Sequence, residues 1–232
     1  MPGKEQLARE AIHVEQNLLK ESVGSQDQIL AAYGGFNHVT FSQNDGFSVK
    51  PMVLPPRRLR ELNSHLMLFY TGIKRTASDI AATFVDNLKG NQSHLKTMQG
   101  LVDEAIAILN SKSDIAEFGK LMNEGWKLKR SLSSKVTNPM VEELHAAAMS
   151  AGALGGKLTG AGGGGFLLLF VEPSQQAKVR QKLSKLIHVP FCFEFSGSQI
   201  IFYDQEQDYA VEERHRSKQT PRQFCELTEL KE

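Results

Sequence analysis

The chain has 232 residues, of which 41% are hydrophobic and 23% charged, a composition that predicts a globular protein with one good core and room for a second small lobe. Its formal net charge of +1 gives no general attraction for nucleic acid or an anionic membrane, so any basic site must be local. The two cysteines lack metal-ligand and CxxC spacing, and no apolar run approaches the ~20 residues of a membrane span, so we expect a cytoplasmic protein without nucleic-acid or membrane partners.

The first predicted element is a helix over residues 5–20. Its apolar side chains recur at helical spacing and form one stripe: Leu7, Ala11, Val14 and Leu18. Glu15 lies on or near this stripe, where an acid is most simply a solvated flank. We expect the stripe to need cover from further structure.

A dense polar cluster follows, and it places Asp27 between Gln26 and Gln28. In one interpretation, Asp27 is the N-cap of a helical turn over residues 29–33. In the other, the flanking amides hold its carboxylate for work on a substrate hydroxyl. The local sequence favours neither.

A hairpin and a boundary come next. Residues 36–41 and 47–53 predict two strands that turn at residues 44–46. The prolines and charges of residues 54–58 interrupt every periodicity and predict a domain boundary. Its arginines are most simply a solvated linker: Arg57, Arg58 and Arg60.

The following segment predicts a buried-type strand over residues 66–71 and then amphipathic helices within residues 77–88, 95–109, 115–126 and 139–151. Lys74 and Arg75 end the strand and either reach an anion or are solvated. Asn138 and Pro139 predict the N-cap and first residue of the last helix. A basic cluster at the end of the 115–126 helix needs no functional explanation: Lys127, Lys129, Arg130 and Lys135.

Residues 155–165 contain seven glycines in eleven positions and lead into an apolar strand over residues 166–171. Such a loop persists where the backbone takes positive φ or lets another molecule approach its amides closely. Successive N–H groups can hold phosphate oxygens, and Lys157 and Thr159 add a positive charge and a hydroxyl. The alternative is a glycine-rich hairpin or linker.

Two familiar glycine motifs do not fit this loop. A Walker loop requires Ser or Thr after its lysine, whereas Leu158 follows Lys157. Gly160, Gly162 and Gly165 have the dinucleotide-binding spacing, but the next segment predicts a strand where a helix is required.

After the strand over residues 166–171 we expect a helix from Pro173 to Ile187, strands over residues 191–195 and 199–203, and a loose polar tail.

The sequence resembles the GHMP small-molecule kinases and, within them, the D-glycero-D-manno-heptose 7-phosphate kinases. Four segments carry the resemblance: residues 23–37, 70–75, 154–166 and 197–201. It implies an α+β fold with three parts. These are the end of a GHMP N-terminal domain (residues 1–55), a ferredoxin-like GHMP C-terminal domain (residues 56–204) and a polar tail (residues 205–232).

The resemblance implies phosphoryl transfer from ATP, with Mg²⁺, to a hydroxyl of a sugar or sugar phosphate. It implies that Asp27 is the catalytic residue and that Glu15 is associated with the metal. The implied substrate-binding residues are Ser25, Gln26, Gln28, Arg75 and Thr159. The implied phosphate and nucleotide loop consists of Lys157, Gly160, Ala161, Gly162, Gly163 and Gly164.

The chain departs from the family in lacking two glycine motifs that family members carry upstream of the aspartate segment. It therefore looks like the C-terminal two-thirds of such an enzyme, and we expect it to bind ATP poorly by itself. We also expect a homo-oligomer or a separate chain that supplies the N-terminal half. The alternative function is a non-catalytic sugar-binding or partner-binding protein derived from such a kinase.

Overall fold

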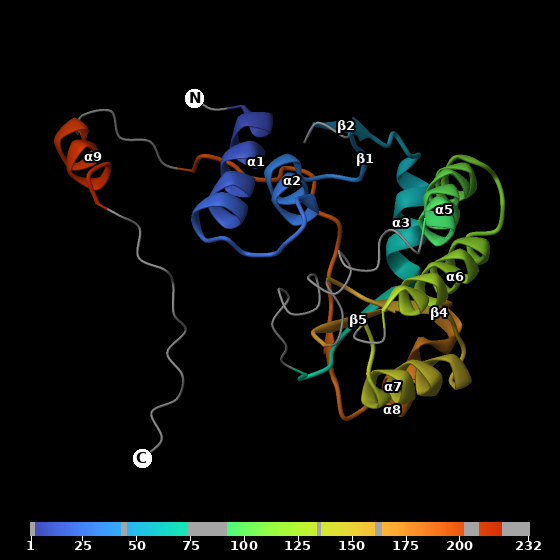
Figure 1. Cartoon of the computed structure of the whole chain (residues 1–232). Helices are drawn as coiled ribbons and strands as arrows, with labels where there is room; N and C mark the ends of the chain where they lie inside the picture. The colour runs from blue at the N-terminus through green and yellow to red at the C-terminus, as the bar shows by residue number, and fades with distance from the viewer. Residues whose placement is uncertain are drawn as a thin grey trace, which may run out of the picture. The chain divides into compact units, whose positions relative to one another are not determined.

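The computed structural model forms two units, each containing helices and antiparallel strands (Figure 1). One unit takes residues 1–51 with 194–232, and the other takes residues 52–193. This mixture confirms the predicted α+β fold. The structure describes residues 3–42, 46–73, 92–133, 136–160, 164–201 and 209–219.

The first unit is built on two packed helices. Helix α1 (Lys4–His13) continues into the π-helical turn η1 (Val14–Leu18), and α2 (Gln26–Tyr33) packs against α1. The small core between them contains Ala8, Ile29 and Ala32. The predicted apolar stripe is largely uncovered in this unit, with exposed side chains at Leu7, Val14 and Leu18.

The predicted hairpin follows these helices and is confirmed. Strands β1 (Asn37–Phe41) and β2 (Phe47–Pro51) pair antiparallel, with Val39 opposite Val49. The expected turn at residues 44–46 falls mostly outside the described residues.

A segment from far along the chain completes the first unit. Gly34 and Gly197 both have φ of 63°, and a Cβ on Gly34 would lie 2.1 Å from the backbone nitrogen of Gly197. The backbone nitrogen of Ser198 donates to the carbonyl of Ala31 at 2.9 Å. These backbone contacts assign residues from Glu194 onward to the first unit, whereas the sequence placed residues 56–204 in the C-terminal domain.

The same contacts explain why two predicted strands are absent. The Glu194 carboxylate accepts hydrogen bonds from the backbone nitrogens of Ser196 and Gly197, which form a turn and no ladder. The prediction of a strand over residues 191–195 is therefore wrong, and the described part of 199–203 is irregular as well. The tail contains the short helix α9 (Ala210–Arg216) among its described residues.

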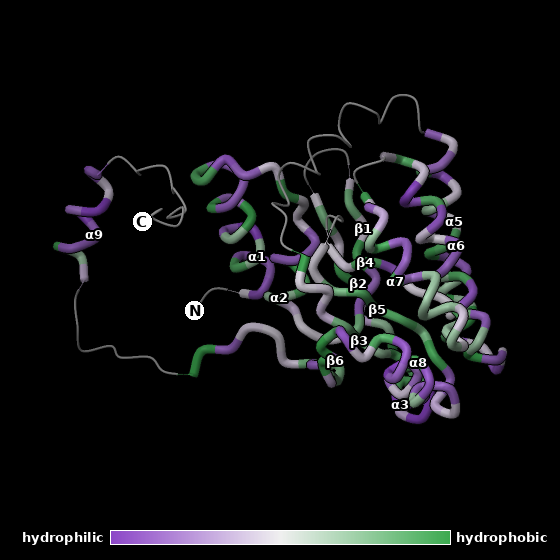
Figure 2. Tube along the Cα trace, turned by 90° about the horizontal axis from the view of Figure 1, so that it is seen from below, coloured by the Kyte–Doolittle hydropathy of each residue, from purple (hydrophilic) through white to green (hydrophobic). Residues whose placement is uncertain are grey.

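The second unit contains a four-stranded antiparallel sheet in the order β4-β5-β3-β6. Its strands are β4 (Ala153–Leu158), β5 (Phe166–Val171), β3 (Leu66–Tyr70) and β6 (Ile187–Val189). Strand β5 is hydrophobic along its length (Figure 2), and four of its side chains are fully buried: Leu167, Leu169, Phe170 and Val171. The two buried strands predicted over residues 66–71 and 166–171 are confirmed.

Helices pack around this sheet. They are α3 (Pro56–His65), α5 (Gln92–Asn110), α6 (Ala116–Leu132), α7 (Pro139–Ser150) and α8 (Gln176–Lys182), which follows the 3₁₀ turn η3 (Pro173–Gln175). Helix α6 packs against α5 and β4, and α7 against α8 (Figure 1). The predicted N-cap is confirmed, since Asn138 accepts a hydrogen bond from the nitrogen of Val141 at 3.0 Å. The helix predicted within residues 77–88 lies outside the described residues.

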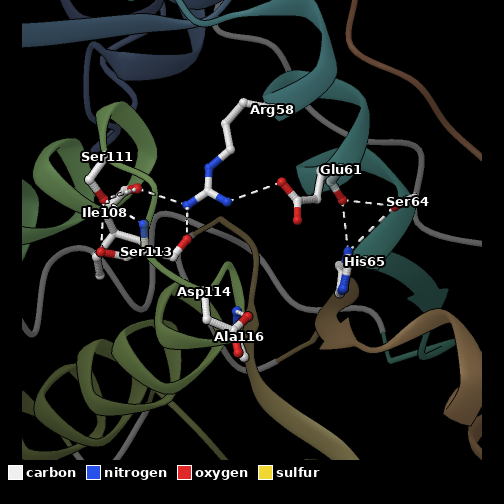
Figure 3. A network of polar contacts seen from close by, with 9 residues as sticks. All are labelled: Arg58, Glu61, Ser64, His65, Ile108, Ser111, Ser113, Asp114 and Ala116. Carbon is white, nitrogen blue, oxygen red and sulfur yellow. Dashed lines mark hydrogen bonds and ion pairs between the residues drawn. The ribbon is translucent and has the colours of Figure 1, made fainter.

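Arg58 makes stabilising hydrogen bonds within the second unit, so its assignment to a solvated linker is wrong. Its side chain is only 11% exposed and donates to the carbonyls of Ile108 and Ser113, each at 2.8 Å (Figure 3). It also pairs with Glu61 at 3.0 Å. Because α3 begins at Pro56, Arg58 lies in its first turn and connects this helix to the link between α5 and α6.

Candidate functional site

Asp27 lies in the first turn of α2, with an exposed side chain. The helix begins at Gln26 and Ser25 occupies the N-cap position, so the interpretation of Asp27 as an N-cap is wrong. Within the part of the chain that the structure describes, the carboxylate of Asp27 makes no hydrogen bond or ion pair. A carboxylate in the first turn is stabilised by the helix dipole and remains available to a ligand.

The residues around Asp27 are held by side chains of the preceding helix. Gln28 is 92% buried (8% exposed) and donates from Nε2 to Oε2 of Glu15 at 2.5 Å. Gln16 donates to the carbonyl of Val23 at 2.9 Å and to Oγ of Ser25 at 3.2 Å. The flanking amides therefore do not hold Asp27 itself, because Gln28 binds Glu15 and Gln26 is exposed.

Glu15 is half-buried and supplies one carboxylate to this region, and Oε1 of Gln28 is a buried oxygen without a hydrogen-bond partner. The described residues contain no group of three or more His, Cys, Asp or Glu side chains that could hold a metal by themselves. Mg²⁺ is commonly bound through one or two carboxylates together with substrate phosphates and water. Glu15 and Gln28 therefore fit Mg²⁺ only as part of a complex with phosphate.

The glycine-rich segment is a hairpin connection, as the alternative interpretation proposed. Strands β4 and β5 are antiparallel neighbours joined through residues 159–165. Lys157, expected in the loop, lies in β4 because its backbone pairs with Leu168. The backbone nitrogen and Oγ1 of Thr159 both donate to the carbonyl of Phe166, at 2.9 and 3.2 Å. The Thr159 hydroxyl proton is therefore already used within the hairpin.

The described glycines of this connection have separate structural roles. Gly160 and Gly165 have φ of 79° and 88°, which other residues rarely adopt. Gly164 packs against β3's continuation, where an added Cβ would lie 2.4 Å from the carbonyl oxygen of Ile73. The expected roles of Arg75, Ala161, Gly162 and Gly163 fall on residues outside those that the structure describes.

Two further glycines bring α6 onto β4. A Cβ added to Gly155 would lie 1.9 Å from the carbonyl oxygen of Gly119, so the helix approaches the strand at van der Waals contact of the backbones. Between Gly119 and Lys129 the α6 helix rises about 15 Å, and between Gly155 and Gly160 an extended strand covers about 16 Å. The matched lengths bring the end of α6 to the start of the glycine turn.

Lys129 is the functional candidate that the sequence reasoning missed. Its Nζ donates to the carbonyl of Gly160 at 2.7 Å. Burial and, to a smaller extent, the positive charge of Lys157 together lower the pKa of the Lys129 ammonium to about 8. Burial lowers the pKa of Lys157 as well, although the residue as a whole is exposed. A signal existed in the sequence, because Lys129 lies three residues after the buried Trp126 and so shares its helix face.

This pKa predicts a pH dependence of stability. Above pH 8 the folded protein releases the Lys129 proton, while the unfolded chain keeps it up to about 10.5. The unfolded state then binds more protons, so the free energy of unfolding rises with pH in this window. Arginine stays charged throughout. Between pH 7.5 and 9.5, we expect wild type to gain about 1 kcal/mol over Lys129→Arg, after allowance for solvent screening.

Urea unfolding monitored by the fluorescence of Trp126 measures this difference, because the chain's single tryptophan is buried in the second unit. A constant difference between the two proteins at both pH values would contradict the lowered pKa of Lys129. The Lys157 charge is common to both proteins and cancels in the comparison.

Among the residues that the structure describes, no helix has the length and apolar character needed to cross a membrane.

Comparisons with known proteins relate this chain to small-molecule kinases. Residues 104–188 match the family model "GHMP kinases C terminal". A D-glycero-alpha-D-manno-heptose 7-phosphate kinase from Campylobacter jejuni is 30% identical over 185 residues, which cover 79% of this chain and 54% of that protein. A mevalonate kinase from Pyrococcus abyssi is 31% identical over 185 residues, covering 76% of this chain and 50% of that protein.

A solved structure shows the same fold. The crystal structure of a D-glycero-D-manno-heptose 1-phosphate kinase from Bacteroides thetaiotaomicron matches with a TM-score of 0.58 and 28% identity, over 87% of this chain and 57% of that chain. The chain thus spans about half the length of the curated kinases named above. From the family match and the shared fold, we conclude that residues 104–188 of this chain have the fold of a GHMP kinase C-terminal domain.

Proposed function

We propose that this chain is part of a sugar kinase that transfers the γ-phosphoryl group of ATP to a hydroxyl of a sugar phosphate such as a heptose 7-phosphate. The similarity to kinases of heptose phosphates carries this proposal, because it extends over 79% of the chain in sequence and 87% in structure. Both units therefore contribute to the likeness.

In this proposal Asp27 orients the acceptor hydroxyl and accepts its proton. Its exposed carboxylate has no competing partner among the described residues, which suits a group that meets its ligand directly. Ser25, Gln26 and Gln28 are its neighbours in the sequence and would contact the sugar. Glu15 would hold Mg²⁺, which in a bound nucleotide complex neutralises charge on the phosphates.

In this proposal the glycine hairpin binds the phosphate groups of the substrates. Lys157 supplies a positive charge at its start, and the positive φ of Gly160 is typical of the backbone turns that bind anions. Phosphoryl transfer depends mainly on positioning and charge stabilisation, which these groups can provide without covalent chemistry.

Acceptor-dependent release of ADP tests the proposal. The protein as isolated from its own cells is incubated with ATP, Mg²⁺ and one acceptor at a time: heptose 7-phosphate, heptose, L-fucose, galactose or mevalonate. We expect ADP release to require a phosphorylated sugar. Binding of heptose 7-phosphate without ADP release would instead identify a non-catalytic sugar-binding protein.

A further inference from the structure

Two lysines from neighbouring elements lie in the region of Gly160. Lys129 comes from the last turn of α6 and donates to the Gly160 carbonyl at 2.7 Å. Lys157 comes from β4, on the same face of the strand as Gly155, which packs against α6, and its charge acts on Lys129. Neither lysine forms an ion pair with an acid within the described ranges. A partly buried ammonium without an anion, beside a second positive charge, weakens the folded state, so the arrangement suits a bound anion.

We propose that Lys129 and Lys157 hold a phosphoryl group of a substrate beside the Gly160 turn. This proposal rests on the proposed function and adds Lys129 to its binding residues. An ammonium group has three N–H donors, and Lys129 uses one in its hydrogen bond to Gly160, so two remain for phosphate oxygens. A phosphate monoester carries close to two negative charges at neutral pH, which matches the two lysines, whereas a carboxylate would neutralise only one.

The neighbouring charges leave this pair uncompensated. Arg130, the next residue of α6, pairs with Glu142 of α7, and Thr137 also donates to Glu142 at 2.7 Å. His145 of α7 is buried, and burial lowers its pKa, which disfavours a positive charge on its ring. Of the charged groups on the elements packed against α6, only Lys157 acts on Lys129. The others are His94, Lys96, Asp103 and Glu104 of α5, and Glu142, Glu143 and His145 of α7.

Calorimetric titration of the full chain with pyrophosphate tests the pair without requiring turnover. At pH 7.5 we expect Lys129→Gln and Lys157→Gln each to weaken pyrophosphate binding at least tenfold. Lys120→Gln is the matched control, because Lys120 is an exposed lysine of the same helix that pairs with Glu117. It should leave the affinity unchanged. The fluorescence of Trp126 verifies that each variant is folded.

The pH profile separates binding by Lys129 from a merely structural role. The ammonium of Lys129, with its pKa of about 8, loses its proton as the pH rises. We therefore expect the wild-type affinity for pyrophosphate to fall roughly tenfold between pH 7.5 and 9.5. Lys129→Arg should bind at pH 7.5 and show a smaller decline, because its guanidinium stays charged.

The phosphoryl group can come from either substrate, and two further titrations distinguish the sources. One uses ADP with adenosine as its blank, and the other uses heptose 7-phosphate with heptose as its blank. The ligand whose affinity falls in Lys129→Gln carries the group that the pair holds. Wild-type affinity for pyrophosphate in both glutamine variants, or no binding by wild type at millimolar pyrophosphate, would overturn the inference.

The two proposals fail separately. If the protein transfers phosphate but the glutamine variants bind pyrophosphate like wild type, the lysine pair is excluded and the kinase function stands. If the pair binds pyrophosphate as expected but no acceptor supports ADP release, the kinase function is excluded and the anion site stands.

Discussion

Asp27→Asn is expected to lower kcat for phosphoryl transfer at least ~100-fold, while KM for the sugar phosphate changes little. Asparagine keeps the size of the side chain and removes its charge and basicity. The substitution breaks no side-chain hydrogen bond or ion pair among the described residues, since the carboxylate of Asp27 makes none there. The loss should therefore come from the reaction itself and leave the fold intact.

Glu21→Gln is the matched control for this experiment. Glu21 is an exposed carboxylate of the same unit that has no assigned role in the site. We expect wild-type kinetics from it, and circular dichroism should show the same helix content in both variants. A wild-type kcat in Asp27→Asn would remove Asp27 from the mechanism.

Gly155→Ala is expected to destabilise the second unit by at least ~3 kcal/mol. The new Cβ would lie 1.9 Å from the carbonyl oxygen of Gly119. The backbone fixes the positions of both atoms, so no rotamer change relieves the overlap. Helix α6 would have to move away from β4, which also separates Lys129 from the glycine turn. Urea unfolding followed by Trp126 fluorescence measures the loss.

Gly100→Ala provides the comparison. Gly100 lies in α5, where an added Cβ meets nothing within 4 Å. The same substitution should be stabilising there by about 0.5–1 kcal/mol, because alanine favours a helix over glycine. Equal unfolding midpoints for Gly155→Ala and wild type would contradict the close approach of α6 to β4.

Local patterns predicted much of the second unit. The apolar runs of β3 and β5 indicated buried strands, and the Asn138-Pro139 pair indicated the start of α7. Each of these signals depends on a few neighbouring residues and on backbone preferences that tertiary packing reinforces. The Asn44-Asp45-Gly46 stretch between apolar segments likewise indicated the hairpin of β1 and β2.

Contacts between distant residues produced the features that the sequence did not predict. Gly155 and Gly156 suggest a loop in isolation, yet they form part of β4, where the lack of a side chain at Gly155 admits α6. In the sequence, Arg58 looks like a charged residue of a linker, because its carbonyl partners lie about 50 residues away along the chain. In the sequence, Lys129 looks like an ordinary charged residue at the end of a helix. It reaches Gly160 only because α6 and β4 run side by side in the folded chain.

The fate of the γ-phosphorus of ATP tests the central claim most directly. Phosphorus-31 NMR follows a mixture of the protein, ATP, Mg²⁺ and heptose 7-phosphate. We expect the γ signal of ATP to be replaced by a second sugar-phosphate signal, together with those of ADP, at a rate that Asp27→Asn lowers at least ~100-fold. Appearance of inorganic phosphate alone, or an unchanged ATP spectrum with heptose 7-phosphate bound, would contradict the assignment of this chain to a sugar kinase.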